Sequence, residues 1–502
     1  MLSFRRVFLD PLHYFTRNVS VMGLSYLLVS LSPIILLPFL THNLTTENFG
    51  VWVQFTITVT IVPAIAILGL PYSFVRYMST SKSREEIQES FYTISFVIAL
   101  VSMGLSLLLF LFAEPISRAL FNDNLPVALI LPVSIFFAAN ILVFFDFFRT
   151  LQKTRLYNFF YLLQAYLMVI LTAVLVVNGF GILGAVVGFL ISQLIIFGMM
   201  LGIIIKNIGF ILPRFINLRE YLHFSVPIVP THISTWILDA SDRYVIGFLI
   251  SLTAVGFYSG GYTVGSLIMV LLSPFYTLLL PILSKYYLEN DLHSIKRFLN
   301  HSLKLFLAVA IPFTFILTFL SEPLLLLLST PEIAANSFFL VPVVAVGGIF
   351  YGLFGIVTQI IILIKRTKLT GNIWMIIIIL NLVLDILLGY RFGIFGVAFT
   401  SLVMFIIAFA ATSHFAFKVI NCNFYPTFII KSIFSSSIIG LILWLVNPHG
   451  ILDVVFALIY CPILYMILML VLRGIRTYEI LILVNIFKDL IFYDKLKDLV
   501  RN

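Results

Sequence analysis

The sequence predicts an all-α, polytopic integral membrane protein with about 14 transmembrane helices, arranged as two parallel six-helix repeats plus a C-terminal helix pair. Three observations predict this class. Only 10% of the 502 residues are charged and 61% are hydrophobic, whereas soluble domains average about 25% charged residues. Many apolar runs reach the roughly 20 residues that a helix needs to cross a bilayer. Landmark residues of the first half also recur, in the same order, in the second half.

Composition and charge exclude several classes of protein. The 51 Phe residues and the mean hydropathy of +1.14 require an apolar solvent, which excludes a soluble globular chain. The 30 basic and 21 acidic residues give a net charge of +9. In a membrane protein the position of these charges matters more than their sum, so no nucleic-acid partner is expected. Two cysteines without metal-ligand spacing predict no disulfide framework, no metal site and no cofactor.

Fourteen apolar runs are predicted to span the bilayer. They cover residues 19–40, 51–71, 91–112, 125–146, 157–178, 182–205, 226–250, 254–283, 303–321, 336–364, 370–390, 393–417, 432–448 and 454–472. Lipid offers the backbone no hydrogen-bonding partner, and the runs lack the alternating pattern of a β-barrel, so every span is predicted to be a helix. The first run is too long for a signal-peptide core and leads directly into another span, so we expect it to stay attached.

Basic residues concentrate in every second loop between these spans. The clusters are Arg5, Arg6 and Arg17; Lys82 and Arg84; Arg149, Lys153 and Arg155; Lys206, Arg214 and Arg219; Lys285, Lys296, Arg297 and Lys304; Lys365, Arg366 and Lys368; Lys418 and Lys431; and the basic residues of the C-terminal tail. The intervening loops carry Arg118 and Arg391 with the acids Glu47, Glu114, Asp123, Glu322, Glu332 and Asp453. By the positive-inside rule, both termini are predicted to be cytoplasmic. The multi-pass chain is expected to lie in the cell (inner) membrane.

The chain is also predicted to be internally duplicated. The recurring landmarks are Gly50 and Gly256, Pro71 and Pro281, Glu114-Pro115 and Glu322-Pro323, Pro132 and Pro342, Lys153-Thr-Arg155 and Arg366-Thr-Lys368, and Gly181-Ile-Leu-Gly184 and Gly393-Ile-Phe-Gly396. Each copy holds six spans, an even number, so both copies are predicted to enter the membrane in the same sense. The predicted units are bundles at 1–212 and 213–422, followed by a helix pair with a cytoplasmic tail at 423–502. Two such bundles are predicted to enclose a cleft that opens to alternate sides by rocking.

Ionisable side chains inside a span are costly and normally face protein or water, so they mark candidate sites. Span seven holds a group of polar and aromatic residues that are candidates for lining the cleft: His232, Trp236, Asp239, Asp242 and Arg243. All of them except Asp242, which flanks the others, share one face of the predicted helix. The alternative is a self-neutralising pair of Asp239 and Arg243, with the arginine reaching toward the interface.

Three further positions are candidates. Arg76, at the inner end of span two, is either an interfacial anchor or a phosphate ligand. Asp385 in span eleven, with Asn381 one turn before it, lacks a charged partner nearby in sequence and is a candidate proton or cation site. Asp146 and Arg149 are spaced as an i,i+3 ion pair at the interface.

Signatures of catalysis are absent from the sequence. Walker A, HExxH and nucleophile-elbow sequences do not occur, and no loop outside the membrane exceeds roughly 20 residues. The sequence therefore predicts a carrier, not an enzyme, powered by an ion gradient, the membrane potential or the substrate gradient. An integral-membrane glycan polymerase or ligase is the less favoured alternative, because it would need a large outer loop with catalytic residues.

Two segments carry a family resemblance. One is residues 44–52, Leu-Thr-Thr-Glu-Asn-Phe-Gly-Val-Trp, running to residues 70–76; the other is residues 239–247, Asp-Ala-Ser-Asp-Arg-Tyr-Val-Ile-Gly, followed by residues 253–259. They resemble the polysaccharide transporter family, the lipid-linked oligosaccharide and O-antigen flippases of lipopolysaccharide assembly. This family shares the multidrug/oligosaccharidyl-lipid/polysaccharide exporter superfamily with the multidrug-and-toxin (MATE) exporters.

The resemblance implies a MATE-like fold and a flippase that moves a polyprenyl-pyrophosphate-linked oligosaccharide to the outer leaflet through a cationic cavity. Arg76 and Arg243 stand where these motifs carry basic residues, and Asp239 or Asp385 is expected to couple transport to H+ or Na+. Expected partners are the lipid-linked glycan, membrane lipids and other glycan-assembly membrane proteins. The alternative is a cation-coupled drug or metabolite antiporter, which would favour acidic residues in the cleft.

Overall fold

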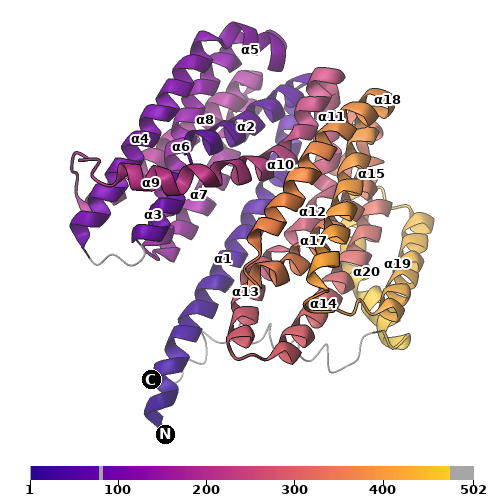
Figure 1. Cartoon of the computed structure of the whole chain (residues 1–502). Coiled ribbons are helices and arrows are strands. Elements are labelled where there is room, and N and C mark those ends of the chain that lie inside the picture. Colours follow the sequence, from indigo (N-terminus) through magenta and orange to yellow (C-terminus); the bar gives the residue numbers. More distant parts are fainter. Residues whose placement is uncertain (1, 79–82, 475–502) are drawn as a thin grey trace, which may run out of the picture.

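The computed structural model is a bundle of long helices joined by short connections (Figure 1). The structure describes the backbone of residues 2–78 and 83–474. It describes side chains from residue 23 onward within those ranges, except at residues 228, 230–239, 273–274, 276–278 and 367. No strand occurs in the described backbone.

The helices fall into two successive sets and a final pair. The first set is α1 (Leu2–Asn43), α2 (Thr46–Ala66), α3 (Leu70–Met78), α4 (Arg84–Leu111), α5 (Ala113–Leu120), α6 (Leu125–Thr150), α7 (Thr154–Leu175), the π-helical turn η1 (Val176–Phe180) and α8 (Gly181–Ile208). The linking helix α9 (Leu218–Ser225) and the 3-10 turn η2 (Val226–Ile228) lead to the second set. That set is α10 (Val229–Leu249), α11 (Leu252–Gly265), α12 (Leu267–Val270), α13 (Ser273–Leu288), α14 (Leu292–Phe319), α15 (Ser321–Leu328), α16 (Pro331–Ser337), α17 (Leu340–Leu363) and α18 (Thr367–Ala416). The final pair is α19 (Pro426–Val446) and α20 (Ile451–Val471).

Helices lie over all of the predicted spans within the described chain. Ten helical segments of this part are long and apolar enough to cross a membrane. Two of the ten, residues 154–208 and 368–416, each contain two predicted spans joined by a tight turn. The chain is therefore a multi-pass membrane protein.

Some span boundaries differ from the prediction. Span two ends at Ala66, because Leu68 and Gly69 adopt left-handed φ angles of 49° and 66°. The single span predicted at 254–283 is three helices, α11 to α13, with a proline in the first turn of α13, where the missing N–H costs no helical hydrogen bond. The run predicted at 336–364 begins in the short helix α16, and its spanning helix α17 starts only at Leu340.

The turn before the last helix of each set has the same backbone geometry. Gly181 has φ 57° and ψ −146°, and Gly393 has φ 61° and ψ −145°. Glycine is favoured here because a Cβ makes this region costly. At Gly393 the chain reverses, since Ile373 and Met404, one from each arm of α18, belong to one buried cluster.

Other helix ends repeat as well. The amides of Lys153 and Arg366 each donate to the carbonyl five residues back, over 2.8 Å and 3.1 Å. The preceding residues, Gln152 and Lys365, have φ angles of 54° and 59°. Helices α4 and α14 are both 28 residues long, and α5 and α15 are both 8. These correspondences support the predicted duplication, whose boundaries at 212 and 422 stay predictions.

The two ends of the bundle carry opposite charge. One end, which we call the basic end, holds the turns from α6 to α7 and from α17 to α18, with Lys153, Arg155, Lys365, Arg366 and Lys368. The other end, the acidic end, holds the turns from α1 to α2 and from α4 to α6, with Glu47, Glu114 and Asp123 beside the single base Arg118.

The two helix sets touch at the acidic end, where α2 packs against α11 (Figure 1). A Cβ on Gly50 would lie 1.9 Å from the carbonyl oxygen of Leu252, and a Cβ on Gly256 would lie 2.4 Å from that of Thr46. The contacts are reciprocal, because Gly256 follows Gly50 by 206 positions and Leu252 follows Thr46 by the same number. The Thr46 hydroxyl also donates to Glu332 of α16 over 2.8 Å. The two glycines therefore occupy equivalent positions of the two sets, at the contact between α2 and α11.

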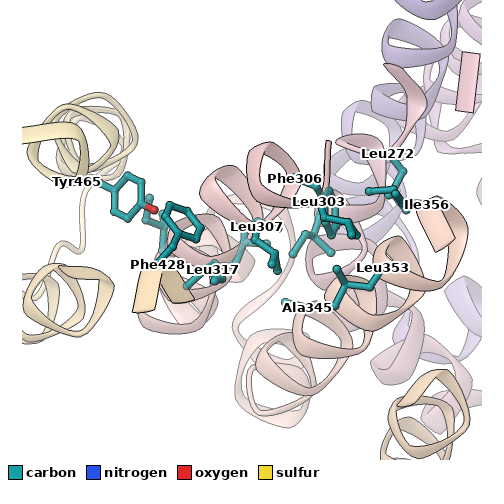
Figure 2. Packing of buried hydrophobic residues seen from close by; sticks show 14 of the residues in the cluster. Leu272, Leu303, Phe306, Leu307, Leu317, Ala345, Leu353, Ile356, Phe428 and Tyr465 are labelled. Atoms are coloured by element: carbon teal, nitrogen blue, oxygen red, sulfur yellow. The ribbon is translucent and has the colours of Figure 1, made fainter. Parts of the chain in front are cut away.

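The final helix pair packs against the second set. Figure 2 shows Phe428 of α19 and Tyr465 of α20 near Leu317 of α14, in one buried cluster. Gly440 allows α19 to approach α14 closely, because a Cβ there would lie 2.3 Å from the ring of Phe319.

The link between the sets is fixed to the first one. Tyr221 of α9 is buried, its carbonyl accepts a hydrogen bond from Ser73 over 2.8 Å, and its hydroxyl lies 2.7 Å from that of Ser90. Helix α9 therefore packs on α3 and α4 at the basic end.

Gly50→Ala is expected to lower the melting temperature of the purified chain, because the added methyl group would overlap Leu252 and overpacking typically costs about 1–3 kcal/mol. Gly104→Ala is the matched control, since a Cβ there meets nothing within 4 Å. Alanine is favoured over glycine in a helix by about 0.5–1 kcal/mol, so this variant should be neutral or more stable. Equal melting temperatures for the two variants would contradict the close crossing.

Candidate functional site

A cavity of about 240 Å³ lies between the two helix sets. From the first set it is lined by Pro33, Leu36, Leu37 and Leu40 of α1 and by Phe49, Trp52, Val53, Thr56 and Ile57 of α2. From the second set it is lined by Arg243 of α10 and by Ser259 and Thr263 of α11. This cavity lies where the sequence predicted a cleft between the halves. We call it the central cavity.

Polar contacts join the two sets beside the central cavity. The Gln54 side-chain amide donates to the carbonyl oxygen of Arg243 over 3.2 Å, and both residues are buried. One turn further along α2, the Thr58 hydroxyl lies 2.7 Å from that of Tyr244. Helices α2 and α10 are thus held together where Arg243 reaches the cavity.

Arg243 is the one charged residue among the described lining residues of the central cavity. It is 8% exposed, and its guanidinium carbon lies 3.9 Å from the ring centre of Tyr262 and 5.2 Å from that of Tyr258. A cation over an aromatic face is stabilised by the ring quadrupole, more strongly when water is excluded. The two tyrosines therefore hold a buried positive charge at the wall of the cavity.

Asp242, the neighbour of Arg243 in the chain, points into the second set. Its carboxylate accepts hydrogen bonds from the hydroxyls of Tyr258 and Ser401, the latter over 3.1 Å. Successive residues of a helix are separated by about 100° around its axis, so the two charges face different neighbours. Asp242 is 3% exposed and its Oδ1 accepts no hydrogen bond.

Asp385 of α18 completes a buried acidic pair. It is fully buried and interacts electrostatically with Asp242. Neither of its oxygens accepts a hydrogen bond of ordinary geometry, and the nearby Thr400 hydroxyl donates instead to the carbonyl of Gly396 over 3.0 Å. Asn381, one turn before it, accepts a hydrogen bond from Ser241 over 3.3 Å, and its Nδ2 has no partner. The sequence had left Asp385 without a partner, and the fold brings it beside Asp242.

Arg76, a further predicted site residue, lies apart from the central cavity. Arg76 is exposed on α3 at the basic end, with its guanidinium 4.3 Å from the ring centre of Phe224, and it does not line the central cavity. The side chains of His232, Trp236 and Asp239 lie outside the described residues, so their predicted places on the stripe stay predictions.

Sequence reasoning did not single out Tyr258, Tyr262 or Ser401. The tyrosines are four residues apart on α11, so they share one face of the helix, which is the signal that could have marked them. Ser401 lies 159 positions from Asp242 in the chain, and no local pattern connects such distant residues.

The fold is that of a multi-pass membrane protein built from two helix sets, with the central cavity between them. Over 90% of its length, the chain superposes with a TM-score of 0.71 on 98% of a structure of the lipid II flippase MurJ in an inward closed conformation, at 19% sequence identity. It also superposes on an inward-facing multidrug resistance transporter of the MATE family, with a TM-score of 0.62 and 13% identity over 80% of this chain and 98% of that one.

A family model described as polysaccharide biosynthesis protein matches residues 15–287, more than half of the chain. The chain belongs to this family. A MatE model matches residues 227–387. Among curated proteins, the chain is 21% identical over 268 residues to the probable low-salt glycan biosynthesis flippase Agl15 of Haloferax volcanii. That alignment covers 53% of this chain and 57% of the relative's length.

Tyr258→Phe is expected to destabilise the protein, because it removes a hydrogen bond to the buried Asp242 carboxylate. Hydrogen bonds to charged groups contribute about 1.5–3 kcal/mol, so the melting temperature should fall by several degrees. Tyr390→Phe, at a residue 87% exposed on α18, is the matched control and should melt like the unaltered protein. A Tyr258→Phe protein as stable as this control would show that the bond contributes nothing.

Proposed function

We propose that the chain is a flippase that moves a polyprenyl-pyrophosphate-linked oligosaccharide from the cytoplasmic to the outer leaflet of the cell membrane, without converting it chemically. The observation that carries the proposal is the nearly buried Arg243 guanidinium at the wall of the central cavity. Family membership and the two flippases among the similar proteins support it.

The chemistry of the cavity wall suits an anionic headgroup. Guanidinium groups match phosphate oxygens through two parallel hydrogen bonds, which are stronger when the site excludes water. No acidic residue occurs among the described lining residues, so the cavity favours a pyrophosphate over an organic cation. Arg76 and the basic loops would attract the headgroup at the entrance, by about 1 kcal/mol per charge near the membrane surface.

The proposed cycle is alternating access, with the basic end and both termini in the cytoplasm, as the positive-inside rule suggests. The two sets are joined at the acidic end by the Gly50 and Gly256 contacts and by the Thr46–Glu332 hydrogen bond. Such contacts would close the cavity on the outer side. Their separation, with the basic ends drawn together, would expose the cavity to the outer leaflet.

Ion coupling is assigned in this proposal to the acidic pair of Asp242 and Asp385. Two buried carboxylates side by side are costly unless a proton or a cation neutralises them. Their unpaired oxygens and the Ser401 hydroxyl are hard oxygen ligands of the kind that H+ or Na+ would use. Asp239 stays a second proposed coupling residue.

A cation-coupled drug or metabolite antiporter is the second candidate. The MatE match over residues 227–387 favours it. The acids of the pair, however, point into the second set and do not line the central cavity, where a cationic drug would need them.

Arg243→Gln is expected to slow the flipping of a fluorescent, sugar-bearing polyprenyl pyrophosphate in proteoliposomes by about 10- to 100-fold, the equivalent of losing about 1.5–3 kcal/mol of charged hydrogen bonding. Arg243→Lys should be intermediate, because it keeps the charge and loses the fork geometry. Arg391→Gln, at an exposed residue, is the control and should keep the full rate. Full activity of Arg243→Gln would remove the main support of the proposal.

Asp385→Asn is expected to abolish the response of transport to an imposed ion gradient. The unaltered protein is tested with a Na+ gradient at constant pH and with a pH gradient without Na+, which identifies the ion. Asp123→Asn, at an exposed residue of the acidic end, should keep that response. A response retained in Asp385→Asn would exclude this carboxylate from coupling, and cation-dependent uptake of a dye without lipid flipping would favour the antiporter.

A further inference from the structure

A cluster of aromatic side chains lies between α1, α6 and α7, outside the lining of the central cavity. The rings of Tyr26 and Tyr161 are 5.2 Å apart at 64°, and those of Tyr157 and Tyr161 are stacked 5.9 Å apart at 22°. The hydroxyls of Tyr26 and Tyr157 lie 3.4 Å apart. The ring centre of Phe145 of α6 lies 5.4 Å from that of Tyr157 and 6.2 Å from that of Tyr161.

The cluster borders a half-exposed ion pair. Arg149 and Asp146, on the last turns of α6, are 2.5 Å apart, as the sequence predicted, with their side chains 50% and 17% exposed. Arg149 interacts electrostatically with Tyr157. The three tyrosines are themselves partly exposed, whereas Phe145 beneath them is 9% exposed. Three partly exposed rings and a partly exposed charged pair therefore lie next to one another.

Its position follows from the periodicity of α1. Tyr26 precedes the cavity-lining residue Pro33 by seven positions, which is close to two turns, so both lie on the same face of the helix. The rise along the helix places Tyr26 about 10 Å nearer the basic end. Tyr157 and Tyr161 stand on the first two turns of α7, which begins at the same end. The tyrosines therefore lie on the approach from the basic end to the central cavity.

We propose that Tyr26, Tyr157 and Tyr161, with Asp146 and Arg149 beside them, form a carbohydrate subsite that binds a sugar ring next to the pyrophosphate. The inference rests on the proposed flippase function and names the part of the substrate that this surface recognises. Tyrosine combines a rigid apolar face, which a pyranose ring can cover, with a polar hydroxyl at its edge. The Asp146 carboxylate accepts hydrogen bonds from sugar hydroxyls, and the Arg149 guanidinium donates to them.

The phosphate charge and the sugar are then recognised by different groups. Arg243 belongs to the second set and lines the central cavity, whereas the tyrosine cluster belongs to the first set. A substrate that lacks the sugar loses only the contacts of the cluster. This separation allows the two interactions to be measured independently.

The test compares equilibrium binding of matched probes to the full chain in lipid nanodiscs. The probes are a short-chain polyprenyl pyrophosphate, and the same lipid carrying one N-acetylglucosamine, glucose or galactose. We expect at least one sugar-bearing probe to bind more tightly than the bare lipid. Tyr161→Leu should lower the affinity for that probe by about three- to tenfold, the range of one aromatic contact, and leave the affinity for the bare lipid unchanged.

Two further variants separate recognition from packing. Tyr161→Phe keeps the stacking face and should retain most of the preference for sugar. Tyr166→Leu is the matched control, because Tyr166 also lies on α7 and contacts α1, through a 2.9 Å hydrogen bond to the Leu28 carbonyl, but it is not one of the clustered rings. Tyr157→Leu is measured in parallel, so that misfolding of one leucine variant does not end the test.

Three outcomes would overturn the subsite. The first is an equal loss of affinity for the bare and the sugar-bearing lipid in the leucine variants. The second is no change in affinity for either lipid in those variants. The third is equal affinity of the unaltered protein for the bare lipid and every sugar-bearing lipid. Failure of the proposed function would look different, because the unaltered protein would then bind neither the bare nor the sugar-bearing pyrophosphate.

Discussion

The fold of this chain depends on one constraint: hydrocarbon neither solvates charge nor offers hydrogen bonds. A polar side chain within the bilayer is therefore costly unless the bundle supplies partners for it. Asp242 shows how this is met, because it accepts hydrogen bonds from Tyr258 on α11 and Ser401 on α18. Three helices are thereby held in register around one carboxylate. Arg243, the next residue, is accommodated by a cation–π contact with the ring of Tyr262.

The two helix sets contact each other through equivalent residues at the acidic end. At the acidic end, Gly50 and Gly256 bring backbone against backbone, and the contacts are reciprocal. The halves are not fully equivalent, since α16 occurs only in the second set and carries Glu332 to Thr46 of the first. The glycine contacts at the acidic end are therefore joined by further contacts between the sets, such as those of Gln54 and Thr58 of α2 with α10.

Adjacent residues of one helix connect the two proposed functions of the site. Arg243 faces the central cavity, whereas Asp242 faces Asp385 within the second set. Asp242 of the acidic pair is the chain neighbour of Arg243, the cation that would hold the substrate, so a change in the charge of the pair would alter the electrostatic environment of Arg243. In the proposed function, the ion site and the site for the anionic headgroup would therefore be neighbours on α10, and coupling would need no long pathway.

The helical class, the spans and the landmarks of duplication could all be predicted from the sequence, because apolar run length and recurring Gly and Pro positions are local properties. The sequence also located Asp385, Arg243 and the Asp146–Arg149 pair, since a charge inside an apolar run is visible without coordinates. The packing of the helices was needed to show that Asp385 lies beside Asp242 and that Arg76 lies against the ring of Phe224 at the basic end. The structure was also needed to show that spans two, eight and ten are broken, because turns such as Leu68-Gly69 leave little trace in hydropathy. Contacts between residues more than a hundred positions apart depend on how helices pack, and no local pattern encodes that.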